Sequence, residues 1–99
     1  MRIPKKIKVG RHWYDVERVK HTTIKGTMGR ISYGARLITV ATHSNVTDKR
    51  YKHEAVFDTF WHELTHAILK DMNNPLENNE RFVTAFSDRL TKAILSARF

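Results

Sequence analysis

The sequence predicts a small α+β domain, with a short sheet in its first half and two helices in its second half. β-branched and aromatic residues gather in short runs within residues 1–44, and apolar residues recur at helical spacing within residues 45–99. The order of strands before helices favours the α+β class. A chain of 99 residues has room for one hydrophobic core, so we expect residues 1–99 to form a single domain.

Four short runs have the composition of strands, and glycine-containing turns separate them. Gly10 begins the first turn, Gly26 and Gly29 bracket the second, and Gly34 lies in the third. The last two runs flank residues 34–36 and read as a hairpin. The expected strands cover residues 3–9, 13–19, 31–33 and 37–40.

Two helices are expected on either side of Asn73-Asn74-Pro75, which ends the first of them. Thr47 or Asp48 is expected to cap the first helix, which runs to about Asp71. Asn78 or Asn79 is expected to cap the second helix, which reaches about Ala97. The expected apolar stripe of the second helix is Phe82, Ala85, Phe86, Leu90 and Ile94.

The first expected helix contains the pattern His-Glu-x-x-His, formed by His62, Glu63 and His66. Side chains four positions apart share one face of a helix, so both imidazoles can reach one zinc ion at about 2.0–2.1 Å. Zinc lowers the pKa of a bound water toward about 7, and the carboxylate of Glu63 is placed to take the proton. The spacing predicts hydrolysis with Glu63 as general base. The alternative is a pair of solvent-facing histidines on an amphipathic helix.

Two histidines leave a catalytic zinc one protein ligand short, since such sites use three protein ligands and a water. The chain has no cysteine, so the third ligand must offer nitrogen or oxygen. Asp71 is close to the helix end, Glu77 lies in the expected loop, and Glu80 lies in the first turn of the second helix. There the helix macrodipole favours an acid even without a metal. Spacing alone leaves the choice open among four carboxylates: Asp71, Glu77, Glu80 and Asp88.

The motif and the opening of the second helix resemble the gluzincin-like metallopeptidases, in particular the small ImmA/IrrE-type and phage-encoded zinc peptidases and the minigluzincins. In those families a ligand glutamate begins the second helix, and a phenylalanine and a small residue follow six and seven places later, as Phe86 and Ser87 follow Glu80 here. The resemblance implies a zincin-like fold with an active-site helix and a backing helix, and zinc held by His62, His66 and Glu80. Val83 and Ser87 stand where alanines are usual, which leaves the subfamily and any repressor substrate open.

Further site residues are expected from the same chemistry. A tyrosine or histidine often stabilises the oxyanion in hydrolytic sites, and Tyr33, His43 and Tyr51 are the candidates, with ordinary core or surface roles as the alternative. His53 is expected on the surface. Peptidases often bind their substrate as an added strand, and the resemblance favours residues 36–42 as the edge that receives it.

The net charge of +8 is unevenly distributed along the chain. Residues 1–36 carry ten basic and two acidic side chains, whereas residues 37–99 carry eight of each. Such asymmetry is compatible with a surface for nucleic acid or an acidic protein, for which Lys5, Lys6 and Lys8 are the residues to test, but the dispersed basic residues favour a simpler interpretation. This simpler interpretation is a solvated basic face that keeps the protein in solution.

Targeting signals are not evident in the sequence. No apolar run approaches the roughly 20 residues that cross a bilayer, and the basic N-terminus has no apolar stretch behind it. We therefore expect an intracellular, cytoplasmic protein without a membrane partner.

Together these patterns predict a zinc-dependent endopeptidase acting on an intracellular protein, although a site with two histidines and a glutamate also accepts other divalent ions. The alternative is a basic module that binds nucleic acid or an acidic protein and whose metal is structural or vestigial. Glu63 separates the two, because a structural site has no use for a carboxylate beside the open coordination position. A hydrolase that finds its substrate on a polyanion would combine both.

Overall fold

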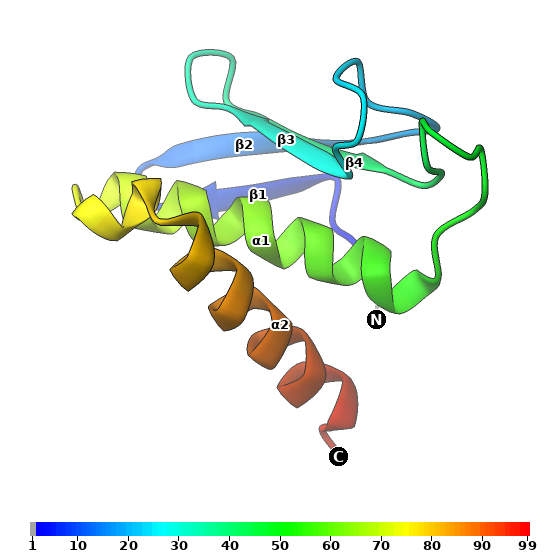
Figure 1. The fold of residues 1–99 in the computed structure, drawn as a ribbon. Helices are drawn as coiled ribbons and strands as arrows, with labels where there is room; N and C mark the ends of the chain where they lie inside the picture. The colour runs from blue at the N-terminus through cyan, green and yellow to red at the C-terminus, as the bar shows by residue number, and fades with distance from the viewer. Residues whose placement is uncertain (1) are drawn as a thin grey trace.

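A computed structural model describes residues 2–99, which form a four-stranded sheet followed by two helices, the expected α+β arrangement. The helices are α1 (His53–Asp71), the short 3-10 helix η1 (Pro75–Asn78) and α2 (Glu80–Ser96). One face of the sheet is covered by α1, and α2 diverges from α1 on the side away from the sheet (Figure 1). The strands are β1 (Lys6–Val9), β2 (His12–Val19), β3 (Gly29–Ser32) and β4 (Leu37–Ala41).

The strands lie in the order β1-β2-β4-β3, so β4 is an inner strand. It pairs in parallel with β2 and antiparallel with β3, and the expected β3–β4 hairpin is confirmed. The expectation that residues 36–42 form an open edge is wrong, because both sides of β4 are occupied by hydrogen bonds. Ile38 and Val40 of β4 are the least exposed residues of the sheet, which places this strand at its centre. The open edges belong to β1 and β3.

The core lies between the sheet and α1. The sheet contributes Val9, Tyr14, Ile38 and Val40, which occupy alternate positions and so share one face. The residues contributed by α1 recur at helical spacing, and they are Val56, Phe60, Leu64 and Ala67. This packing fixes the height of α1 over the sheet, and with it the position of the His-Glu-x-x-His motif.

The first helix begins later than its expected caps. Lys52 is its N-cap and offers no side-chain cap, so the prediction of Thr47 or Asp48 is wrong. Asp48 lies in a turn with φ of 60°, and its carboxylate accepts a hydrogen bond from His21 at 2.7 Å. The following residues run back along the end of β4, where the backbone N–H of Tyr51 donates to the carbonyl of Thr42. Tertiary pairing therefore delays the helix by about one turn.

The second helix begins where the sequence predicts, at Glu80, and the side chain of Asn79 caps it by accepting the N–H of Phe82 at 3.0 Å. Its buried face differs from the expected stripe. Phe86 is 46% exposed, whereas Val83, Ser87 and Thr91 are buried. These smaller side chains let α2 approach α1 closely, and α2 packs only on α1 and η1 within the described residues. The hydroxyls of Ser87 and Thr91 donate to helix carbonyls, so their burial leaves no unpaired polar atom.

None of the helices formed by residues 2–99 has the length and apolar character needed to cross a lipid bilayer.

Candidate metal centre

The second half of α1 presents the two histidines of the motif on one face. Their ring centroids are 5.0 Å apart, as the spacing of four residues requires. Glu63 and His66 are buried, each with 7% of its surface exposed, while His62 is half-buried. One ligand atom from each of the three side chains lies within 4.8 Å of the others. A metal ion is therefore within reach of all three.

Glu80 completes the cluster from the first turn of α2. One carboxylate oxygen, Oε1, lies 2.7 Å from Nε2 of His66, and the other, Oε2, lies 3.1 Å from Nε2 of His62. The cap of α2 by Asn79 and the packing of α2 on α1 set this position. Of the four carboxylates that spacing left open, Glu80 is the one that the fold brings to both histidines. Its side chain is 68% exposed and so free to shift by the few tenths of an ångström that separate these contacts from the spacing of ligands around one zinc ion.

The hydrogen bonding of His66 tests whether this cluster suits a metal. Nδ1 of His66 lies 2.8 Å from the backbone carbonyl of Glu77 in η1, and a carbonyl can only accept, so Nδ1 carries the proton. Nε2 of His66 then faces the carboxylate of Glu80 at 2.7 Å, and a positive charge must lie between the two atoms for them to attract. Either a proton on Nε2 or a metal ion bound to both atoms supplies that charge. A metal ion satisfies both imidazoles and the carboxylate together, and a backbone carbonyl that orients a ligand histidine is usual at metal sites.

Burial sets the protonation of the other two motif residues. Desolvation lowers the pKa of His62, although Glu80 partly opposes this, so His62 is a neutral imidazole with a lone pair available near neutral pH. Desolvation also raises the pKa of Glu63 to about 7, against the opposing influence of His66 and with a smaller contribution from Glu80. A carboxyl with this pKa both accepts and releases a proton near neutral pH.

A close approach of β3 to α1 forms the wall of the site opposite α2. A Cβ on Gly29 would clash with the methyl group of Thr59 and would lie 3.5 Å from Cγ of Glu63. Only glycine therefore lets the start of β3 lie against the helix beside the motif. The sequence analysis placed Gly29 at a turn and missed this role, because a close approach between distant segments leaves no local pattern.

Tyr33 and Glu77 close one end of the site. The hydroxyl of Tyr33 donates to Oε1 of Glu77 at 2.6 Å, and burial together with this bond raises the pKa of Tyr33. Glu77 thus orients two site residues, Tyr33 through its carboxylate and His66 through its carbonyl. A cavity of about 310 Å³ opens here, lined by Ile31, Tyr33, Glu63, His66, Glu77, Asn78 and Glu80.

The remaining candidates lie elsewhere. His43 contacts Thr42 and Arg50 at the far end of β4, and Tyr51 packs against the core, so the structure brings neither to this cavity. Asp71 lies against Gly10, where an added Cβ would clash with its carboxylate. Asp88 pairs with Lys92 at 3.2 Å on the surface of α2. His53 begins α1 and is exposed, as expected.

The chain was compared with models of protein families, with curated proteins and with solved structures, and none of them matches it.

Proposed function

We propose that this protein is a zinc-dependent metallopeptidase whose metal is held by His62, His66 and Glu80. The observation that carries the proposal is the convergence of two imidazole Nε2 atoms on one carboxylate, at 2.7 and 3.1 Å, with the tautomer of His66 fixed by the carbonyl of Glu77. Two histidines and a glutamate are a donor set that catalytic zinc uses, with one coordination position left for water. The layout of these residues also agrees with the gluzincin-like resemblance of the sequence.

Zinc in such a site polarises a peptide carbonyl and lowers the pKa of water. The protein's own contribution starts with Glu63. Its carboxylate lies beside the ligand atoms, with Oε1 3.9 Å from Nε2 of His62, and in the metal-free chain burial raises the pKa of Glu63 above its ordinary value, which makes it a stronger base. Glu63 takes a proton from the attacking water and passes it to the leaving amine. Because Glu63 is buried, solvent competes little for that proton.

Tyr33 is the candidate for stabilising the oxyanion, since its hydroxyl is protonated at neutral pH and lines the same cavity as Glu63. In the free protein that hydroxyl is engaged by Glu77, so the bond must open or be shared when substrate is present. A peptide substrate fits best as an added strand on β3, whose outer edge is open and whose first residue, Gly29, lies beside Glu63. This replaces residues 36–42 as the expected docking strand.

The experiment combines metal content with turnover. Elemental analysis of the purified chain is expected to give about one zinc per protein, with the metal lost in His66→Ala, weakened in Glu80→Ala and retained in Glu63→Gln. Asp88→Ala, which removes a carboxylate from α2 away from the cluster, serves as the matched control and keeps its zinc.

Turnover is measured on a quenched fluorescent peptide library. Glu63→Gln is expected to lower the rate by about 10²–10⁴-fold without loss of zinc, because only the proton transfer is removed. Absence of tightly bound metal after zinc is supplied contradicts the proposal. Full metal content with equal turnover in wild type and Glu63→Gln would leave a metal site without the proposed chemistry.

A further inference from the structure

The excess positive charge of the chain is concentrated between Arg18 and His53. This stretch holds eight Lys or Arg side chains and a single acid, Asp48. Residues 1–17 hold five basic and two acidic side chains, and residues 54–99 hold five basic and seven acidic ones. The middle stretch thus carries +7 of the total +8. Three of its cations lie outside the loops: Arg18 on β2, Arg30 on β3 and Arg36 in the β3–β4 turn.

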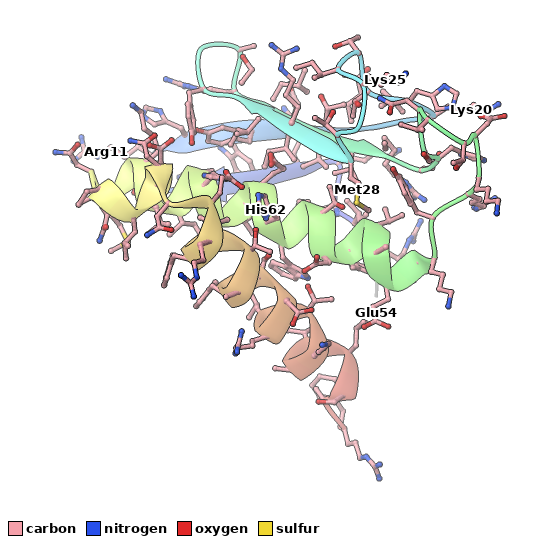
Figure 2. All side chains as sticks on the ribbon, viewed as in Figure 1. Arg11, Lys20, Lys25, Met28, Glu54 and His62 are labelled. Atoms are coloured by element: carbon pink, nitrogen blue, oxygen red, sulfur yellow. The ribbon has the colours of Figure 1, made fainter. Side chains whose placement is uncertain are left out.

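The other cations of this stretch lie at one end of the molecule, where the loops 20–28 and 42–52 meet. Figure 2 shows Lys20 and Lys25 at the end of the molecule opposite to Arg11. The second loop is tied to the first because the N–H of His43 donates to the carbonyl of Lys20 at 3.0 Å. We call the exposed cations of these loops the basic loop surface, and they are Lys20, Lys25, Lys49, Arg50 and Lys52.

Hydrogen bonds between the two loops hold them in one ordered arrangement. The amide of Asn45 in the second loop makes four hydrogen bonds to the first: it accepts the N–H of Gly26 at 2.8 Å and donates to Thr22 Oγ1, to the Thr22 carbonyl and to the Ile24 carbonyl. Thr22 is itself buried. The cations are therefore carried by a backbone that is already ordered, which lowers the entropy cost of binding a partner.

The single acid of the stretch is used to hold the loops together. Asp48 accepts a hydrogen bond from His21 at 2.7 Å and lies 3.6 Å from Nζ of Lys20. It leaves Lys25, Lys49 and Arg50 without an ion pair among the described residues. The lysines of β1 differ, because Lys6 pairs with Asp15 at 3.8 Å and Lys8 lies over the ring of Trp13. Two of the strand lysines expected to mark a binding surface are thus engaged, whereas of the loop cations only Lys20 is paired within the described residues.

We propose that the basic loop surface binds the phosphate backbone of duplex nucleic acid without sequence preference. Clustered Lys and Arg on preformed loops suit phosphates, which supply the charge-dependent part of such binding. Among the described residues of the two loops, there is no exposed Phe, Tyr or Trp on which single-stranded bases could stack, and the exposed ring of His21 is engaged by Asp48. The exposed apolar side chains there are only Ile24 and Val46, which is little for insertion into a lipid surface.

The basic loop surface lies at the start of α1. His62 follows His53, the first residue of this helix, by nine residues, which is about 14 Å along the helix axis. The binding itself does not depend on the proposed peptidase activity.

The test is fluorescence anisotropy with the full chain and a labelled duplex DNA of mixed sequence, between 50 and 200 mM KCl. One variant carries Lys25→Glu, Lys49→Glu and Arg50→Glu. The matched control carries Arg89→Glu, Lys92→Glu and Arg98→Glu, which change the net charge equally on the other side of the molecule. Circular dichroism and zinc content check that both remain folded, and Lys→Gln and Arg→Gln versions replace any variant that does not fold.

The loop variant is expected to bind at least about 30-fold more weakly at 100 mM salt and to lose about two to three units of the salt slope, whereas the control changes a few-fold. Equal losses in both variants would mean attraction by net charge alone and would overturn the proposal. So would the absence of binding at 50 mM KCl. Tighter binding to vesicles containing phosphatidylserine than to DNA, lost in the loop variant, would assign the surface to membranes instead.

Discussion

The candidate metal centre lies in the second half of α1 and the basic loop surface lies near its start, yet the two place their charged groups in opposite environments. At the metal centre Glu63 and His66 are each 7% exposed, and desolvation is the main influence on the pKa of Glu63 and of His62. At the loops the cations are exposed, and the one carboxylate, Asp48, has its pKa lowered by the hydrogen bond from His21. Burial shifts the pKa of individual side chains, whereas exposed charges act together on a partner and are screened by salt.

The largest expected difference between the two regions is the effect of zinc on the stability of their variants. At a free zinc concentration about 1,000 times the dissociation constant, binding to the folded state alone adds about 4 kcal/mol to the free energy of unfolding. His66→Ala should lose almost all of this stabilisation, while the loop variant should keep it. Thermal unfolding with and without zinc measures both. Equal zinc stabilisation of wild type and His66→Ala would place the metal elsewhere.

The pH dependence of stability should differ in sign between the regions. Burial raises the pKa of Glu63 to about 7 from 4.5, so between these values the folded, metal-free chain holds a proton that the unfolded chain has released. The folded state therefore loses stability as the pH rises through this window, by about 3 kcal/mol. Glu63→Gln removes that loss, so its advantage over wild type should grow from pH 4.5 to pH 7.5.

Urea unfolding in the presence of a chelator measures this difference, and an advantage that stays constant with pH would contradict it. Asp48→Asn provides the comparison at the loops. Because the pKa of Asp48 is lowered from 3.8, its carboxylate stabilises the fold above that value and loses this contribution as the pH falls. The effect of Asp48→Asn should therefore shrink toward low pH, the opposite trend to the wild-type loss at Glu63.

The smallest effect is expected from the hydrogen bonds between the two loops. Asn45→Ala removes four hydrogen bonds between the loops and should lower the free energy of unfolding by about 1–2 kcal/mol. DNA binding should weaken with it, because the cations are no longer held together, while zinc content stays unchanged. Thr23→Ala, at an exposed neighbouring side chain, is the control. Unchanged stability and DNA affinity in Asn45→Ala would show that the loops do not need the hydrogen bonds of Asn45 to keep their arrangement.

Local patterns predicted the helices and the motif well, because these features depend on residues that are close together in the chain. The spacing of His62 and His66 fixes their common face within one helical turn, and Asn79 caps the helix that begins with Glu80 as its position suggested. The β3–β4 hairpin likewise follows from residues close in the chain. The start of α1 was misjudged because Asp48, a good cap in isolation, is engaged by His21, 27 residues away.

By itself, then, the sequence determined the α+β class, the motif on its helix and the acid that opens α2, since each rests on interactions within a few residues. Only the tertiary structure decided which carboxylate meets the histidines and which backbone carbonyl orients His66. It also decided that β3 is the open strand beside Glu63 and that the cations gather at the loops. These depend on sheet order and helix packing, which bring together segments far apart in the chain. Burial of the whole core sets that arrangement, and no local pattern encodes it.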